Sequence, residues 1–470
     1  MNNAEPITLQ IKCRAEVAEK IVAILESEDS PRITTTAEDF EEQERDLLKQ
    51  AHELCALILE KQIQHSIDSE EGREAQRQIM QAIPFKMLDK GKEEVRLRTC
   101  CGFEVTVRVS YFTRKGNRRG KKRYPGLYPG LLVLGIYERC TPGLASEVSM
   151  FAGMLGSLEE ARQVLAERGV DLNIKTVRRI AYRFAERART AQRVMELDFG
   201  PGVIGRKVAI SADGGRTRIR EKKRGRKTAK GRNRFRGAWR EPKLFIIYVV
   251  DAEGKLDRSF MPIMDALIQG PDAIFKLLHA YLSQLNLSEA DRILFIADGA
   301  PWIWNRIPDL IKRLGVEPDQ VHQLIDFYHA VEHLGKVASL RKGWSSQQHK
   351  SWVSKHRRLL LQGHVDKVVS AVKAICRGRN SRAIRTQMDY FVKNSARMAY
   401  EQLRGLKMPI GSGSVESAIR RVVNLRLKGP CTFWCKENAE AILLLRCYWK
   451  AGRWNMLKNM ANTFTPEAYA

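Results

Sequence analysis

The segment spanning residues 205–327 most restricts what this chain can fold into, because its hydrophobic pattern changes period in a fixed order. Three consecutive apolar runs with the composition of β-strands lie at 205–215, 241–254 and 255–264. Helix, strand, helix and strand patterns then follow in turn, at 271–285, 291–300, 305–315 and 320–327. Three neighbouring strands followed by an alternation of helix and strand predict an α/β domain with a mixed sheet.

The region that follows is expected to be helical. No proline occurs between Asp319 and Met408, and apolar residues recur there at helical spacing. The segment GSGSVESAIRRVVNLRLKG, residues 411–429, then opens a final helix behind a Gly/Ser cap. We therefore expect a helical insertion between the last predicted strand and this helix.

The first part of the chain has a different character. Residues 37–82 place apolar side chains at three-to-four spacing and predict an amphipathic helix, or a pair of helices, with an acidic face. That apolar stripe is compatible with packing onto its own domain and with dimerisation. Residues 94–112 alternate apolar and polar around Cys100-Cys101-Gly-Phe, with Val105, Val107 and Val109 on one face, which predicts a half-buried β-hairpin.

Residues 157–189 predict a helix-turn-helix. Ser157 with Glu160 three residues later forms a capping-box pattern, and Gly169 closes the first helix. A short turn precedes a second helix with an apolar face. The other face of that helix is basic and would read DNA in the major groove, although plain helical hairpins share the pattern. The basic residues of this face are Lys175, Arg178, Arg179 and Arg183.

The charge of the chain points to a polyanionic partner. The 81 Lys and Arg residues outnumber the 54 Asp and Glu residues and give a net charge of +27, although residues 1–80 are acidic. Residues 216–240 hold thirteen basic side chains and one acid, Glu221, which predicts a solvated loop or hairpin. Phe235 and Trp239 interleave these charges and could stack on bases, so we expect phosphate contact rather than a merely solubilising loop. The cations expected to contact DNA here are Arg220, Lys222, Lys223, Arg224, Arg226, Lys227, Arg232, Arg234 and Arg236.

Several protein classes do not fit this sequence. The apolar run at 244–250 is too short to span a bilayer, and the N-terminus lacks the layout of a signal peptide. Nine scattered cysteines do not form a disulfide framework. Adjacent Cys100 and Cys101 have no second CxxC pair, which argues against a zinc ribbon, and Cys431 and Cys435 are expected to pack rather than bind metal. We expect a cytoplasmic protein that handles DNA or RNA.

Three carboxylates could carry chemistry. Asp213 lies where the first predicted strand ends, Asp298 ends the buried strand, and Glu416 lies in the first turn of the helix after GSGS. Converging on one sheet edge, they could hold two divalent ions for in-line phosphoryl transfer, with Mg²⁺ preferred and Mn²⁺ as a substitute. Each residue alone is weak evidence for a catalytic site. An Asp-Gly pair is commonly a turn, and a Glu in the first turn of a helix commonly serves to match the helix dipole.

Several motifs resemble a known family. SADGG, IADGAPWIW, DFYHAVEHLGK and PIGSGSVESAIRR, with RLKGPCTFW and AEAILLLR, resemble the DDE transposases of bacterial insertion sequences, the ISKra group in particular. The resemblance covers about residues 205–455. It implies an RNase H-like core with a helical insertion, a catalytic triad of Asp213, Asp298 and Glu416, and two Mg²⁺ ions bound by the same three residues. The D-x-x-H segment also makes Asp326 and His329 possible auxiliary residues of the site, although His329 and His333 could equally cap or pack.

The resemblance also implies an organisation and partners. The expected regions are an acidic helical region at 1–85, a hairpin plus helix-turn-helix at 86–195, the core at 196–335, an all-helical insertion at 336–408, and the Glu helix with the completion of the core at 409–470. The expected partners are double-stranded DNA, as terminal inverted repeats and as target, and a second copy of the chain in at least a dimer. The expected chemistry is metal-dependent cleavage at the element end, followed by attack of the freed 3′-hydroxyl on target DNA. A nuclease that cuts without joining, and a catalytically silent DNA-binding protein derived from a transposase, remain as alternatives.

Overall fold

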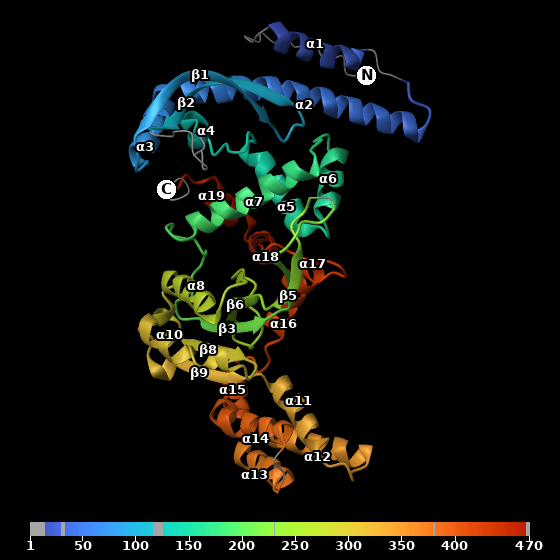
Figure 1. Cartoon of the computed structure of the whole chain (residues 1–470), viewed down its shortest axis with the longest axis vertical. Helices are drawn as coiled ribbons and strands as arrows, with labels where there is room; N and C mark the ends of the chain where they lie inside the picture. Colours follow the sequence, from blue (N-terminus) through green and yellow to red (C-terminus); the bar gives the residue numbers. More distant parts are fainter. Residues whose placement is uncertain (1–14, 30–32, 116–125, 230, 379–380, 467–470) are drawn as a thin grey trace, which may run out of the picture. The chain divides into compact units, whose positions relative to one another are not determined.

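The computed structural model describes residues 15–29, 33–115, 126–229, 231–378 and 381–466 (Figure 1). The chain divides into two compact units, which are described separately. Unit 1 comprises residues 1–194 and 458–470, and unit 2 comprises residues 195–457. Residues 458–470, which we expected to help complete the core, therefore belong to unit 1. No helix in the described ranges has the length and apolar character needed to cross a bilayer.

The N-terminal part of unit 1 joins a long helix to a β-hairpin. Its elements are α1 (Ala15–Asp29), α2 (Ala37–Asp68), α3 (Glu70–Ala82), β1 (Met87–Arg98) and β2 (Glu104–Arg114). The predicted helix pair and hairpin are confirmed, with Val105, Val107 and Val109 buried on one face of β2. Ala56, Ile63 and Ile67 of α2 join these valines in one core, so the C-terminal half of α2 packs onto its own unit. The N-terminal half leaves its apolar side chains exposed, namely Phe40, Leu47 and Leu48.

The second part of unit 1 is a helical cluster. It comprises α4 (Pro129–Val133), α5 (Pro142–Met154), α6 (Leu158–Glu167) and α7 (Ile174–Ala191), and α19 (Trp454–Asn462) reaches it from the other end of the chain. The helical pair predicted at 157–189 is present as α6 and α7, and α5 packs against both. Ser157 caps α6 through the N–H of Glu160, whereas the Glu160 carboxylate accepts from Gly156 and not from Ser157, so the reciprocal box is not formed.

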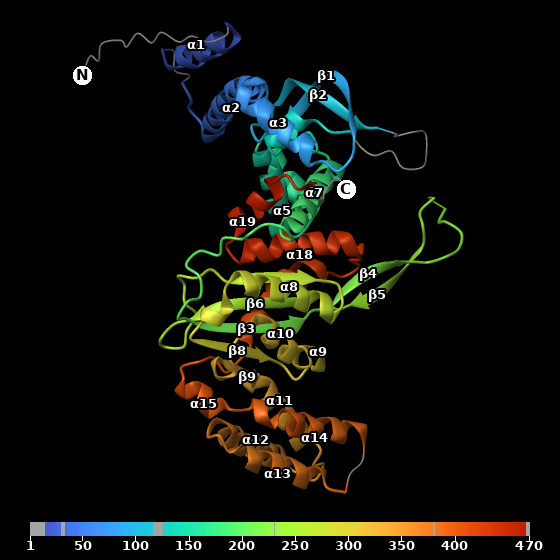
Figure 2. The ribbon, with the colours of Figure 1, turned by 90° about the vertical axis from the view of Figure 1, so that its left-hand side faces the viewer.

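Unit 2 is built on a mixed five-stranded sheet, so the chain is an α/β protein. The strands are β3 (Lys207–Gly214), β6 (Lys243–Val250), β7 (Ile263–Leu267), β8 (Arg292–Ala297) and β9 (Val321–Ile325). Their order in the sheet is β7-β6-β3-β8-β9, with the first three antiparallel and β3, β8 and β9 parallel. Between β3 and β6, a separate ribbon of β4 (Thr217–Lys222) and β5 (Phe235–Arg240) projects from the end of the sheet (Figure 2). The tract predicted as a loop or hairpin is thus a hairpin.

The third predicted strand was misplaced. We expected it at 255–264, but the paired strand is β7 at Ile263–Leu267. Pro262 has no N–H to donate to a ladder, so pairing with β6 begins only after it. Residues 251–262 form a loop closed by the ion pair between Arg206 and Asp257.

Short and long helices connect the strands. α8 (Pro271–Gln284) packs on β6 and β7, and α10 (Ile307–Leu314) packs on α8. Two single 3₁₀ turns and one short helix complete these connections, at η1 (Leu287–Glu289), η2 (Pro318–Gln320) and α9 (Pro301–Trp304). A third 3₁₀ turn, η3 (Ser395–Arg397), lies beyond the last strand. The helical insertion begins directly after β9 and comprises α11 (Phe327–Ala338), α12 (Ser346–Leu361), α13 (Val365–Cys376), α14 (Arg382–Asn394) and α15 (Tyr400–Gly405).

The helix expected at the end of the chain is interrupted and is not the last. α16 (Gly413–Ile419) packs on β3 and β6, continues as a π-helical turn, η4 (Arg420–Asn424), and ends as α17 (Leu425–Leu427). Arg446 of α18 (Lys436–Lys450) donates to the carbonyls of Arg421 and Val422 in the π-helical turn. α18 also packs on β7, and all of its residues from Ile442 to Tyr448 are buried.

Candidate active site

Three acidic residues lie at one edge of the central sheet. Asp213 is the penultimate residue of β3, Asp298 directly follows β8, and Asp326 directly follows β9. The parallel register pairs Ser211 with Ile296, which places Asp213 and Asp298 side by side two residues further on. The three parallel strands therefore bring these side chains to the same edge, where ligands of open α/β sheets commonly bind.

The local backbone orients Asp298. Its Oδ1 accepts from the N–H of Ala300 at 3.0 Å, and its carbonyl accepts from the Trp304 indole at 2.6 Å. Both bonds fix the turn between β8 and α9, so Asp298 is held in place by a turn rather than by a flexible loop.

Asp326 links two backbone segments through its carboxylate. Its side chain is fully buried, and Oδ1 accepts from the N–H of His329 at 2.8 Å as the N-cap of α11. Its other oxygen accepts from the N–H of Ser412. The N–H of Phe327 also donates to the carbonyl of Ile410 at 2.9 Å. Asp326 therefore ties the start of the helical insertion to the segment that leads into α16.

This tie brings His329 to Glu416. The Nε2 of His329 lies 3.6 Å from Oε1 of Glu416, and its Nδ1 lies 3.7 Å from Oε2 of Glu332. The hydroxyl of Ser412 donates to the same Glu416 oxygen at 3.3 Å. His333, one turn further along α11, instead stacks on Tyr390 at 3.7 Å between ring centroids and bonds Gln387. The two histidines thus differ: His329 faces the carboxylate edge, and His333 packs.

The electrostatics of Asp213 link it to the other candidate residues. Burial raises the pKa of Asp213 to about 6, and the negative charges of Asp298 and Glu416 add to the rise. The N–H of Gly214, which donates to Oδ1, and the nearby His329 lower the pKa and offset part of this effect. The structure thus brings Asp213, Asp298, Glu416 and His329 into one electrostatic neighbourhood.

The carboxylates suit a hard divalent cation by type and by charge. A bound cation would relieve the repulsion among these negative charges. Carboxylate oxygens are also the ligands that Mg²⁺ and Mn²⁺ prefer. In the described part of the chain, no three His, Cys, Asp or Glu side chains close around a common point at ligand distance. The donor set is therefore suitable, and its side chains are not drawn together in this structure. The cysteines within the described ranges form no such group either, and Cys431 and Cys435 are exposed rather than packed as expected.

One residue at this edge was not found from the sequence. Tyr390 of α14 packs against Gly299, so close that a Cβ there would lie 2.5 Å from its ring. Burial raises the pKa of Tyr390, and the charges of Asp298 and Asp326 raise it further. Its buried hydroxyl has no hydrogen-bond partner among the described residues. Only the fold of the insertion brings this helix to the sheet edge, and no local motif marks it.

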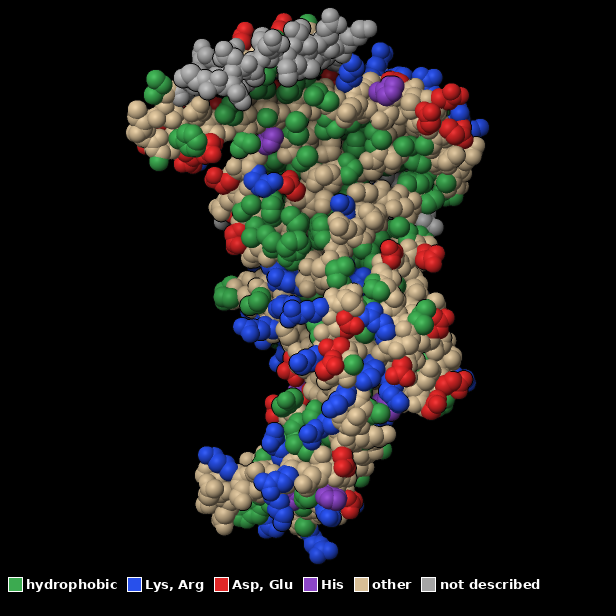
Figure 3. Space-filling view, turned by 180° about the vertical axis from the view of Figure 1, so that it is seen from behind, with side chains coloured by type: hydrophobic (Ala, Val, Ile, Leu, Met, Phe, Trp, Pro, Cys, Tyr) green, Lys and Arg blue, Asp and Glu red, His purple; other side chains and the backbone are tan. Residues whose placement is uncertain are grey.

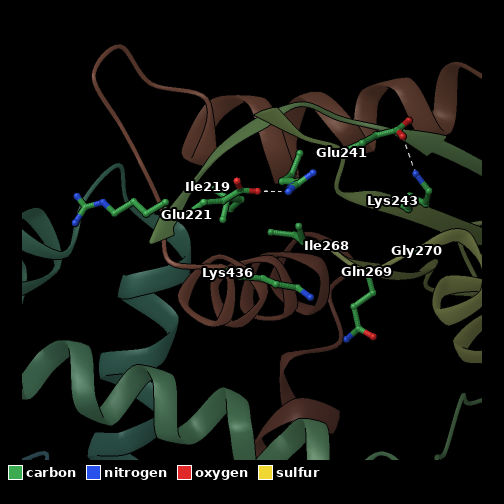
Figure 4. A pocket seen from close by; sticks show the side chains of 10 residues that line it. Ile219, Glu221, Glu241, Lys243, Ile268, Gln269, Gly270 and Lys436 are labelled. Atoms are coloured by element: carbon green, nitrogen blue, oxygen red, sulfur yellow. Dashed lines mark hydrogen bonds and ion pairs between the residues drawn. The ribbon is translucent and has the colours of Figure 1, made fainter. Parts of the chain in front are cut away.

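A cavity of about 700 Å³ lies beside the same edge, at the foot of the ribbon (Figure 4). Lys243 of β6, the register partner of Gly214, lines it and is almost fully buried. Its Nζ lies 2.6 Å from Glu241 and 4.6 Å from the centre of the Trp302 ring. Glu221 pairs with Arg240 in the same wall. Two of the cations that line this cavity are thus already neutralised.

The basic ribbon is exposed, as expected. The expected DNA contacts from Arg220 to Arg236 are all exposed in the structure, and of these Arg236 pairs with Glu221. Figure 3 shows Lys and Arg side chains spread over the face of unit 2 seen from behind, with acidic side chains between them.

The basic face predicted for the second helix of the hairpin is on the surface of unit 1. Lys175, Arg178 and Arg179 of α7 are exposed, and Arg183 is half-buried. Val177, Ile180 and Ala181 are buried as predicted, whereas Ile174 is 43% exposed and lies outside the core. Arg179 pairs with Glu138, and Arg183 pairs with Glu186. Arg178 has no ion-pair partner in the described ranges, which leaves its charge available for a phosphate.

If α7 contacts DNA, Arg178→Ala should weaken binding more than a matched change on α6. One lost phosphate contact lowers the slope of log K against log salt by about 0.9. Arg162 of α6 pairs with Glu159 and serves as the control, Arg162→Ala. The check is a salt titration of duplex binding for both variants. Equal slopes for the two would contradict the role of α7.

Comparison with known proteins adds no relative: no family model, curated protein or solved structure matches this chain.

Proposed function

We propose that this chain is a DDE-type DNA transposase with an RNase H-like core, which cuts and joins the ends of an insertion sequence. The observation that carries the proposal is the electrostatic coupling of Asp213 to Asp298 and Glu416, although the helical insertion separates Glu416 from the strands in sequence. The antiparallel strands β3, β6 and β7, followed by alternating helices and strands, have the order expected of such a core.

The proposed chemistry assigns a task to each residue. Asp213, Asp298 and Glu416 would hold Mg²⁺, which when bound supplies charge stabilisation and a reactive oxygen for in-line displacement at phosphorus. His329 lies against Glu416 and orients that carboxylate. Asp326 and Ser412 would hold the starts of α11 and α16 together and would bind no substrate. The exposed arginines of the ribbon and of α7 would bind the phosphates of the terminal repeats and the target, and a dimer would hold two ends together.

The proposal is tested with purified protein, Mg²⁺ and labelled DNA that carries the ends flanking the gene. The wild type should cut and join the ends, and Asp298→Ala should do neither while binding them with similar affinity. Asp309→Ala, which changes an exposed carboxylate paired with Arg313 on α10, is the matched control and should keep full activity. Cutting without joined products would favour a nuclease. Specific binding without cutting in Mg²⁺ or Mn²⁺ would favour a silent DNA-binding protein.

A further inference from the structure

The two faces of the β4–β5 ribbon differ in chemistry. The register pairs Arg218 with Trp239, Arg220 with Gly237, and Lys222 with Phe235, and directly paired residues share a face. This aromatic face therefore carries two aromatic rings and a row of cations, and no acidic side chain. The opposite face carries Ile219, which is buried, and Glu221, which pairs with Arg236 and Arg240. The single acid of the tract is thus kept away from the rings.

A third ring completes the aromatic face. Phe433, from the segment before α18, lies over Gly237 so closely that a Cβ at Gly237 would meet its ring at 2.5 Å. The centroids of Phe433 and Phe235 are 5.5 Å apart. Gly237 therefore makes room for a ring between Phe235 and Trp239, and the row Phe235–Phe433–Trp239 runs along the ribbon.

Guanidinium groups lie on these rings. Arg216 and Arg218 lie over Trp239 at 5.4 and 5.5 Å, Arg218 also lies over Phe433 at 4.7 Å, and Arg220 lies over Phe235 at 4.8 Å. Even so, Phe235 remains 42% exposed and Trp239 51% exposed. Exposed rings alternating with cations are what a single-stranded nucleic acid binds, with bases on the rings and phosphates on the cations.

The spacing of the rings favours unpaired bases over a duplex. Phe235 and Trp239 are four residues apart on one strand, about 13 Å at the usual rise, with Phe433 between them. Stacked bases of a duplex follow one another every ~3.4 Å along a strand and keep their faces covered. Bases can therefore reach successive rings of this row only when they are unstacked from one another.

The ribbon begins beside the candidate active site. Arg216 follows Asp213 by three residues, and Gly215 packs against Val423 of the π-helical turn after α16. β4 is anchored to the segment after this turn: Arg220 donates its N–H to Trp434 at 2.7 Å, and Thr217 donates its hydroxyl to Leu427 at 3.2 Å. A DNA strand that extends from the carboxylate edge would therefore meet the foot of the ribbon first.

We propose that the aromatic face of the ribbon is a binding site for unpaired DNA nucleotides next to the cleavage site. The proposal rests on the proposed function, because that function supplies a DNA end whose strands separate beside Asp213. The rings of Trp239 and Phe235 stack on the bases, and Arg216, Arg218 and Arg220 bind the phosphates between them.

The test measures binding of the full chain to a labelled oligothymidylate and to a duplex of equal length, by fluorescence anisotropy without divalent metal. Trp239→Ala should weaken single-strand binding about 5- to 160-fold, the range for loss of one stacked base, and leave duplex binding within about twofold. Trp239→Phe should restore most of the affinity. The salt dependence should not change, because no charge is removed.

Two control variants distinguish the effect of base stacking from that of charge and from the loss of any exposed aromatic ring. Phe40→Ala removes an exposed ring of α2, 54% exposed, and should change neither affinity. Arg220→Gln removes one cation of the aromatic face and should lower the salt slope for single strands. Unchanged single-strand binding by Trp239→Ala, an equal loss for duplex, or tighter binding of oligouridylate than of oligothymidylate would each overturn the proposal.

The assay also separates this proposal from the proposed function. Binding is measured without Mg²⁺, so the loss expected for Trp239→Ala can be observed whether or not the wild type cuts DNA. Wild-type cleavage with unaltered binding by Trp239→Ala would retain the transposase and reject the ribbon site.

Discussion

Asp213→Asn should abolish DNA cleavage and at the same time make the free protein more stable at pH 7. The pKa of Asp213 is raised from its ordinary value of 3.8 to about 6 by burial and by the charges of Asp298 and Glu416. Ionising this group in the folded protein therefore costs free energy, at most about 3 kcal/mol at 1.36 kcal/mol for each pKa unit. Asparagine keeps the shape without the charge, so we expect a gain of about 1–3 kcal/mol.

The gain should depend on pH in a defined direction. A carboxyl whose pKa is higher in the folded than in the unfolded state binds a proton more tightly when folded, so it lowers stability as pH rises from 3.8 to about 6. Below pH 3.8 the wild type and Asp213→Asn should be equally stable, and above pH 6 their difference should be constant. Calorimetric unfolding at several pH values checks this, with about 2–4 °C in Tm for each kcal/mol.

The same substitution should lower the catalytic activity, although it raises the stability. Loss of a metal ligand removes several kcal/mol of transition-state stabilisation, so cleavage by Asp213→Asn should fall by about three orders of magnitude or more. Mg²⁺ should stabilise the wild type and not the variant, which narrows the difference in Tm. Asp309→Asn, an exposed change on α10, is the control and should alter neither the stability nor the rate of cleavage. A variant that is less stable than the wild type at pH 7 would contradict the raised pKa.

Asp326→Ala should cause a large loss of stability in unit 2. Its fully buried carboxyl accepts two backbone N–H groups, from His329 and Ser412. Each buried N–H left without a partner costs about 1–3 kcal/mol, so the expected loss is about 2–6 kcal/mol. Chemical denaturation measures it, and cleavage should fall because His329 and Glu416 no longer hold their 3.6 Å contact.

Ser345→Ala is the matched control for this change. Ser345 caps α12 of the same insertion and accepts from the N–H of Gln348 at 3.2 Å, but it does so in contact with solvent. Loss of an exposed cap costs about 1 kcal/mol, and cleavage should not change. If Asp326→Ala costs no more than Ser345→Ala, then Asp326 is an ordinary helix cap and does not join α11 to the segment before α16.

Periodicity in the sequence was enough to predict most elements of unit 2. Strands β3, β6, β8 and β9 and helices α8 and α10 lie where their patterns placed them, because period two and period 3.6 report which side chains face a core. The placement of β7 was wrong because apolar composition extends across Pro262, where ladder pairing cannot begin. Helix α5 was not predicted, because small and apolar residues occupy all of its faces and form no amphipathic stripe.

The candidate site shows the same division. Asp213 and Asp298 could be predicted, because a carboxylate at the end of a buried strand is placed by the strand itself. Asp326 was predicted as a possible auxiliary residue of the reaction, and the structure buries it between two backbone N–H groups. Tyr390 could not be found, because nothing local marks a helix residue that reaches Asp298 only when the insertion folds back.

By itself the sequence determined the identity and chain order of the strands, the basic tract and the carboxylates at strand ends, since these depend on local hydrophobic period and charge. The tertiary structure decided which of these residues meet. Register and strand order place Asp213 beside Asp298, the carboxyl of Asp326 joins α11 to the start of α16, and Gly237 admits Phe433 to the ribbon. Contacts between residues far apart in the chain depend on how whole elements pack, and no local pattern records that packing.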